Sequence, residues 1–253
     1  MENALLIGLS RQIALSRELE VVANNIANLN TTGFKANGAV FEEFLMPVAS
    51  ADQFQGADRR LSYVQDRATW HNFAPGPLQQ TGNPLDVAID GDAFLVVQTE
   101  RGERFTRNGA LQINAAGELV TNNGERVLGE GGPIQFQNTD RDISINLDGS
   151  ITVREGANAD SARGKLRLVR FDNAQQLRKD GSSLFAAPEG VTPQPAQNVR
   201  VVQGSVEQSN VRGVIEMSRM IEITRNYTQI ATLLQQQGEQ RRSAIEKLAE
   251  VPA

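Results

Sequence analysis

The feature that most constrains this fold is a helical pattern at each end of the chain, with none in the long stretch between. In the first thirty residues, apolar side chains recur at spacings of three and four, the period of one face of an α-helix. The last of them, Leu19, Val22, Ile26 and Leu29, alternate steps of three, four and three, as in the seam of a coiled coil. A second apolar stripe lies between 214 and 234. Both ends are therefore predicted to be helices that need partners.

The first helix is followed by the stretch NNIANLNTTGFK, residues 24–35. Because Asn favours caps and left-handed positions, we expect the helix to end near residues 28–30. We expect Asn25 and Asn28 to bond between packed helices, since both lie beside the seam. Gly33 is expected to break the helix, and Phe34 to anchor the following segment onto a neighbouring molecule.

Four segments follow from these patterns. Residues 1–33 form the N-terminal helix, which makes a helical core domain with the C-terminal helix at 204–253. The second helix begins either at a capping box of Ser205 and Gln208 or at Asn210 as N-cap. Residues 34–75 show no clear period and are predicted to be an extended connector.

The region from 76 to 203 is predicted to be an antiparallel β domain. Its short apolar runs are separated by dipeptides that favour tight turns, because glycine readily adopts positive φ. These turns are Asp90-Gly91, Asn108-Gly109, Ala116-Gly117, Asn123-Gly124 and Asp148-Gly149. The fold class is therefore α+β, with long N- and C-terminal helices forming a coiled-coil-like layer around a central antiparallel β domain.

Composition excludes several kinds of function. A net charge of −5 without a basic cluster argues against nucleic-acid binding. The absence of cysteine excludes disulfides, thiolate metal sites and a cysteine nucleophile. The opening residues lack the basic start of a secretory leader, and no apolar run is long enough to span a bilayer, so we expect no membrane insertion.

Catalytic and metal-binding patterns are weak. The single histidine, His71, has no ligand set around it in sequence and is predicted to be a surface or packing residue. Asp86, Asp90 and Asp92 miss the spacing of a calcium loop, and the glycine-rich stretch at 129–133 lacks the residues of a phosphate loop. We therefore expect no enzyme activity, no cofactor, no metal and no small-molecule substrate.

Three separated motifs resemble one family. ANNIANLNTTGFK at 23–35 resembles the N-terminal motif of the bacterial flagellar axial proteins, the rod and hook subunits. TGNPLDVAIDGDAFLVV at 81–97 is similar to the β-domain motif of that family. QGSVEQSNV at 203–211 and EMSRMIEITRNY at 216–227 resemble its C-terminal helix. VLGEGG at 127–132 looks more like a proximal-rod than a distal-rod subunit, which stays the alternative.

The resemblance marks a set of residues for assembly. They are Asn25, Ile26, Ala27, Asn28, Thr32, Gly33, Phe34, Asn210, Val211, Met217, Ile221, Arg225 and Tyr227. It implies a structural subunit of a hollow rod in the flagellar basal body, which crosses the periplasm, transmits torque and conducts export. It also implies partnership with other rod proteins and with copies of itself, and passage through the flagellar type III export apparatus without a cleaved signal.

The two apolar stripes carry a hypothesis of their own. A lone pair of helices buries only part of each stripe, so the free energy of ordering the pair is close to balanced or unfavourable. We therefore expect both ends to be largely disordered until neighbouring subunits cover them. The alternatives are that the helices pack on their own β domain, or that the chain is a secreted carbohydrate-binding or adhesive β module. The latter is disfavoured because the β region has no Trp or Tyr.

Overall fold

The computed structural model describes residues 2–45, 62–155, 160–181 and 183–249, which form two units. The first unit comprises Met1–Ala27, Asn37–Trp70 and Arg212–Ala253, and the second comprises Asn28–Ala36 and His71–Val211. The chain therefore passes from one unit to the other four times. The fold class is α+β, as predicted, because two helices accompany a mainly β domain.

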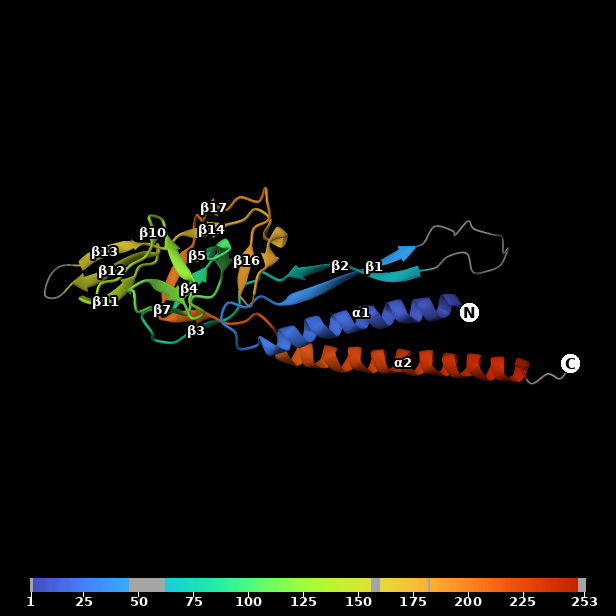
Figure 1. The fold of residues 1–253 in the computed structure, drawn as a ribbon. Helices are drawn as coiled ribbons and strands as arrows, with labels where there is room; N and C mark the ends of the chain where they lie inside the picture. The colour runs from blue at the N-terminus through green and yellow to red at the C-terminus, as the bar shows by residue number, and fades with distance from the viewer. Residues whose placement is uncertain (1, 46–61, 156–159, 182, 250–253) are drawn as a thin grey trace. The chain divides into compact units, whose positions relative to one another are not determined.

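The first unit is built on two long antiparallel helices, α1 (Glu2–Ala27) and α2 (Gly213–Ala249). They lie side by side in Figure 1, and Arg219 of α2 makes an ion pair with Glu18 of α1 at 2.7 Å. Three buried apolar residues, Leu15, Val22 and Ile223, form the seam between the helices. The predicted helical stripes therefore pack on each other within one chain.

A two-stranded sheet completes the first unit and corrects the predicted connector at 34–75. Strands β1 (Asn37–Leu45) and β2 (Ser62–His71) pair with each other, and β1 contacts α1. The indole of Trp70 packs directly on Gly38, where a side chain would overlap it. The sequence did not predict these strands because apolar and polar residues do not alternate simply along them. The part of the connector at 46–61 lies outside the described residues.

The second unit is an antiparallel β domain with one short 3-10 helix. Its elements are β3 (Leu78–Gln80), β4 (Val87–Asp90), β5 (Phe94–Thr99), β6 (Gly102–Thr106), β7 (Leu111–Ile113), β8 (Leu119–Thr121), β9 (Arg126–Gly129), β10 (Gly132–Pro133), β11 (Asp140–Ile145), β12 (Ser150–Glu155), β13 (Asp160–Lys165), β14 (Leu168–Arg170), η1 (Ala174–Gln176), β15 (Arg178–Lys179), β16 (Leu184–Ala186), β17 (Gln194–Pro195), β18 (Arg200–Gln203) and β19 (Ser205–Glu207).

The largest sheet has the order β15-β16-β6-β5-β9-β8-β7, with β10 beside β9, β14 beside β5 and β17 beside β14. A separate sheet has the order β11-β12-β13, and two further pairs are β18-β4 and β19-β3. All the strand pairings described in the second unit are antiparallel. An aliphatic core lies around Leu95, Val97 and Ile151, and an aromatic core around Phe94, Phe105 and Phe185.

Three of the five predicted hairpins are confirmed. Gly117 joins β7 to β8, Gly124 joins β8 to β9, and Gly149 joins β11 to β12. All three glycines have positive φ, between 80° and 95°. The turn at each site therefore requires the conformation that its glycine adopts at little cost.

The other two turns do not close hairpins. After Gly91 the chain leaves β4 for β5, but β4 pairs with β18, which comes from far along the sequence. Gly109 lies where the backbone of Val87 approaches it closely, and the amide of Val87 donates to the Gly109 carbonyl at 2.9 Å. The prediction failed at Gly109 because close approach, and not a turn, requires glycine there.

The start of the second helix is also corrected, because α2 begins at Gly213 and not near 204. Ser205 and Glu207 belong to β19, which pairs with β3, so the capping-box spacing of Ser205 and Gln208 has no helix to cap. Pairing with β3 satisfies the backbone groups of this segment and competes successfully with helix formation.

Candidate assembly site

The family-motif residues divide between the two units. Ala27 ends α1, and Ile26 and Tyr227 pack beside the seam of Leu15, Val22 and Ile223. The remaining N-terminal ones, from Asn28 to Phe34, lie in the second unit. The N-terminal motif is thus shared by two folded bodies.

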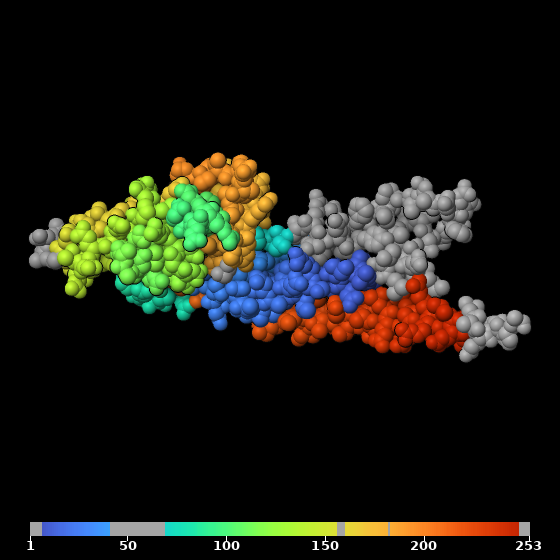
Figure 2. Space-filling model, viewed as in Figure 1, coloured from blue at the N-terminus to red at the C-terminus, as the bar shows by residue number. Residues whose placement is uncertain are grey.

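Helix α2 presents an apolar stripe to solvent on the side away from the seam. Val214, Met217 and Ile221 follow each other at spacings of three and four, and their exposed fractions are 81%, 52% and 71%. Ile223, two positions further on, is 3% exposed against α1. Figure 2 shows α1 covering one flank of α2 and leaving the other flank open. Arg225, also exposed, borders this surface.

Asn25 serves a local purpose and not the predicted inter-helix bond. Its side chain is 1% exposed, its Oδ1 accepts from the amide of Asn37 at 2.9 Å, and its Nδ2 donates to the carbonyl of Asn37 at 2.8 Å. An amide carries both the acceptor and the donor that the backbone groups of one strand residue require, whereas an ionised carboxylate only accepts. Asn25 therefore fixes the start of β1 onto α1.

The turn after α1 is held by short-range bonds. Thr31 donates its hydroxyl to Asn28 Oδ1 at 3.1 Å, and the Thr31 amide donates to the Asn28 carbonyl at 3.3 Å. The neighbouring Thr32 is half-buried. Asn28 thus closes a turn in the second unit, and its bond between packed helices stays a prediction.

Gly33 does more than end a helix. Its φ is +68°, and a side chain there would overlap the backbone of Arg107 and Asn108. Its amide donates to the carbonyl of Glu207 at 2.7 Å. Positive φ and close backbone approach both require glycine, which explains the position of Gly33 in the motif.

Phe34 is buried inside its own chain, which corrects the prediction that it anchors a neighbouring molecule. The side chain is 1% exposed, and Nζ of Lys179 lies 3.9 Å from the centre of its ring. A cation over an aromatic face is attracted by the ring quadrupole. Burial also lowers the pKa of Lys179 to about 8.

Asn210 joins three segments of the second unit. Its Oδ1 accepts from the amide of Ala36 at 2.8 Å, and its Nδ2 donates to the carbonyls of Asn72 at 2.7 Å and Ala74 at 2.8 Å. Asn210 is therefore not an N-cap of α2. Val211, which follows it, is half-buried at the end of the unit.

Three buried charges beside these residues were not foreseen from the sequence. Nζ of Lys35 lies 2.6 Å from Oε1 of Glu207, and Nε of Arg107 lies 3.0 Å from Oε2 of the same carboxylate. Desolvation lowers the pKa of Lys35; the Glu207 carboxylate opposes this effect, and the Arg107 charge adds to it. No sequence pattern could reveal the pair, because 172 positions separate Lys35 from Glu207.

His71 is a packing residue, one of the two roles predicted for it. It is 6% exposed, and its ring meets those of Phe73 and Phe185 edge-on, with centroids 6.0 and 5.6 Å away. Burial lowers the pKa of the imidazole, and the charge of Lys179 lowers it further.

We expect the His71 imidazole to titrate below its usual value of about 6.5. Between the two pKa values, His71 is protonated in the unfolded chain but not in the folded chain. The free energy of unfolding therefore falls as the pH drops from 6.5 through the folded pKa. NMR titration measures this directly, because the chain has only one histidine. Lys179→Gln should move the pKa back toward 6.5. An unshifted pKa in the wild type would contradict the expectation.

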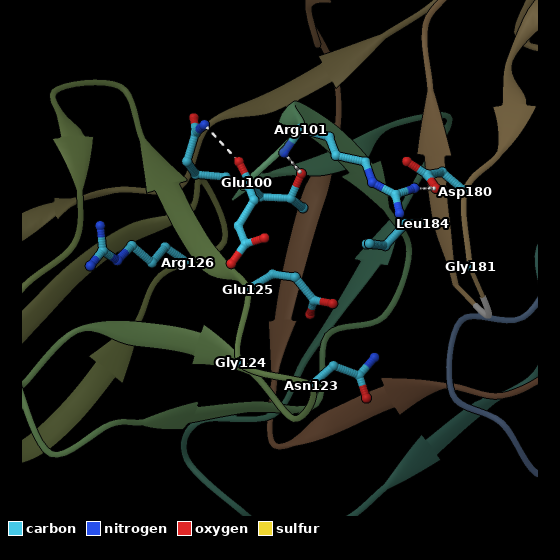
Figure 3. Close-up of a pocket in the computed structure, with 11 residues that line it drawn as sticks. Glu100, Arg101, Asn123, Gly124, Glu125, Arg126, Asp180, Gly181 and Leu184 are labelled. Atoms are coloured by element: carbon cyan, nitrogen blue, oxygen red, sulfur yellow. Dashed lines mark hydrogen bonds and ion pairs between the residues drawn. The ribbon is translucent and has the colours of Figure 1, made fainter.

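A hollow of about 860 Å³ lies among the loops that follow β5, β8 and β15. Figure 3 shows the guanidinium of Arg101 directed at Asp180, which it meets at 3.0 Å. Arg104 holds the same carboxylate at 2.6 Å and lowers the pKa of Asp180. The described lining residues include no aromatic ring, so this hollow lacks the stacking platform that a sugar site uses.

Neither a metal-binding cluster nor a membrane-spanning helix is found among the described residues. Among them, no group of three or more His, Asp or Glu side chains is arranged to hold a metal ion. Asp86 instead accepts from Thr81 Oγ1 at 2.7 Å and from Asn83 Nδ2 at 3.0 Å. Neither described helix has the length and apolar character needed to span a bilayer.

Three family models match the chain in order. Residues 5–35 match the flagella basal body rod protein model. Residues 88–153 match the D1 domain of the flagellar hook protein FlgE/F/G, and residues 202–246 match the C-terminal model of the flagellar basal body rod FlgEFG proteins.

Individual relatives match over nearly the full length. The chain is 39% identical over 253 residues to the flagellar basal-body rod protein FlgF of Caulobacter vibrioides, covering 99% of this chain and 100% of the relative. It is 35% identical to FlgF of Mesorhizobium japonicum, covering 98% of each chain. It is 34% identical to FlgG of Agrobacterium fabrum, covering 89% of this chain and 91% of the relative.

The matched models cover both helices and part of the β domain, and the relatives cover almost every residue of the chain. The chain therefore belongs to the family of flagellar basal-body rod proteins, which are structural subunits and not enzymes.

Proposed function

We propose that this chain is a proximal-rod subunit, which assembles with other rod proteins and with copies of itself through the outer apolar surface of its helix pair. The observation that carries the proposal is the exposed stripe of Val214, Met217 and Ile221 on α2. Contiguous apolar side chains on one helix face mark an interaction surface. The FlgF relatives, at up to 39% identity, favour the proximal position over the distal one of FlgG.

A coiled-coil-like layer is the arrangement that suits this surface. One side of α2 already packs on α1 through Ile223, and the opposite side offers a second stripe at the same spacing. Helix α1 adds exposed apolar side chains of its own, Ile7, Leu9 and Ile13. Each helix pair can therefore contact further helices on more than one side, and contacts that do not close on themselves build a tube.

On the basis of the family resemblance, the proposal has three further parts. The rod transmits torque, it keeps an export channel open, and the flagellar type III apparatus delivers this chain to it. The carbohydrate-binding alternative is less well supported, since the hollow beside Arg101 and Asp180 in the β domain is lined by paired charges. Trp70, which is exposed and could serve as a sugar platform, lies in β2 of the first unit and packs on Gly38.

We expect Ile221→Asp to reduce incorporation into rods at least about 30-fold, the effect of removing about 2 kcal/mol at an interface centre. The side chain is 71% exposed, so the substitution removes nothing from the seam. Gln229→Asp is the matched control, because it places the same charge on an exposed polar position of α2. The measurement is the amount of each variant in purified basal bodies, together with swimming.

Equal incorporation of the Ile221→Asp and wild-type chains would contradict the proposed surface. Loss of incorporation in both Ile221→Asp and Gln229→Asp would indicate that charge anywhere on α2 is harmful, and would also count against a specific apolar stripe.

A further inference from the structure

Three charged side chains from distant parts of the sequence are closed off from solvent in the second unit. Lys35 and Glu207 have side chains that are each 1% exposed, and that of Arg107 is 3% exposed. Lys35 belongs to the segment that follows α1, Arg107 follows β6, and Glu207 ends β19. Buried charges are rare and costly unless each finds a partner.

The charges do not balance in pairs, because one carboxylate serves two cations. Lys35 and Arg107 each contact a different oxygen of Glu207, at 2.6 and 3.0 Å. Arg107 also donates from one guanidinium nitrogen to the carbonyls of Gly91 and Ala93, both at 2.6 Å. Its place is therefore fixed by the β domain itself, whereas Lys35 and Glu207 are brought in by segments near the two ends of the chain.

Glu207 holds the N-terminal segment by more than its charge. Its carbonyl accepts from the amide of Gly33 at 2.7 Å. Its Oε1 accepts from the amide of Gly76 at 2.8 Å, and Lys35 Nζ donates to the carbonyl of Ala74 at 2.8 Å. The N-terminal segment, residues 74–76 and β19 thus meet at a single carboxylate.

We propose that Lys35, Arg107 and Glu207 form a completion latch: residues 28–36 dock stably in the β domain only when the carboxylate of residue 207 is in place. Without that carboxylate, docking would bury Lys35 beside Arg107, two like charges with no counter-ion between them. The latch goes beyond the rod assignment and does not depend on it. It makes docking of a segment near the start of the chain conditional on a residue in its last fifth.

The latch predicts an unequal response to two substitutions. Glu207→Gln leaves two buried cations, so hydrogen–deuterium exchange of residues 28–36 in the full chain should accelerate at least about 100-fold. Lys35→Met leaves Arg107 and Glu207 as a neutral pair, so the same peptides should accelerate less than about tenfold. Peptides covering β5 report whether the rest of the domain stays folded.

Glu118→Gln is the matched control, because Glu118 is also a largely buried carboxylate, with Arg126 Nε at 3.0 Å, but lies outside the latch. It should leave exchange of residues 28–36 unchanged. If Glu207→Gln opens the whole domain, the double variant Lys35→Met/Glu207→Gln decides, since it leaves one buried cation instead of two. Its exchange should then be slower than that of Glu207→Gln.

Three results would overturn the latch. One is a larger acceleration of exchange in residues 28–36 by Lys35→Met than by Glu207→Gln. The second is continued protection of residues 28–36 in Glu207→Gln while residues 205–211 open. The third is a double variant no better protected than Glu207→Gln.

Discussion

A carboxylate at position 22 will prevent rod formation while leaving the β domain folded. Val22 is 1% exposed in the seam between α1 and α2, where it packs with Leu15 and Ile223. Val22→Asp places an unpaired charge there, at a cost of about 4 kcal/mol or about a thousandfold in the helix-pairing equilibrium. Cells carrying this variant should not swim, and their basal bodies should lack the subunit.

Val22→Thr is the control for this substitution, because threonine keeps the shape of valine and adds a hydroxyl without a charge. It should reduce assembly far less. The NMR signal of His71, which belongs to the β domain, should be unchanged in both variants. Normal swimming of the Val22→Asp strain would contradict the proposed role of the helix pair.

The same proteins test whether the helices are ordered before assembly. Among the residues whose burial is described, the seam cluster has three buried apolar members, Leu15, Val22 and Ile223, although α2 alone has 37 residues. We propose that neighbouring subunits supply the burial that completes both helices. Far-ultraviolet circular dichroism of the wild-type monomer should then show less helix than the assembled rod. In that case Val22→Asp changes the monomer spectrum little and acts mainly on assembly.

A methyl group at position 33 will destabilise the β domain by about 3 kcal/mol or more. Gly33 combines a φ of +68° with direct contact against the backbone of Arg107 and Asn108. A left-handed conformation costs an alanine about 1–2 kcal/mol. The overlap with the backbone adds to this cost, since neither backbone segment can move aside freely. Denaturant unfolding followed through the β domain measures the loss for Gly33→Ala.

Two other glycines separate these causes. Gly124 has a φ of +95° with no atom near its missing side chain, so Gly124→Ala should show the conformational cost alone. Gly109 lies against the carbonyl of Val87 without positive φ, so Gly109→Ala should show the overlap alone. If Gly33→Ala were no worse than Gly124→Ala, the close approach at residue 33 would be of no consequence.

Local patterns predicted the local structure well. The spacing of Leu19, Val22 and Ile26 identified one side of the seam, and turn chemistry identified the hairpins at Gly117, Gly124 and Gly149. Each of these features depends on residues a few positions apart, so the sequence contains the whole signal.

Several other predictions were wrong because contacts between residues far apart in the sequence decide the structure there. Ser205 has the letters of a helix cap, but β3, more than a hundred positions earlier, pairs with it as a strand. Phe34 was expected to contact a neighbouring molecule and Asn25 to bond between packed helices. Nothing local shows that Lys179 lies over the Phe34 ring or that β1 begins beside Asn25. The motif residues are thus explained in large part by folding of the single chain.

The four passages between the two units have a mechanical consequence. They fall after Ala27, Ala36, Trp70 and Val211, so the backbone connects the helical unit to the β domain at four points. A single cleavage cannot separate the two units, and a twisting load between them is shared among four connections of the one chain instead of straining one hinge. In the rod that we propose, each subunit would therefore keep its two units joined even where one of these connections is broken.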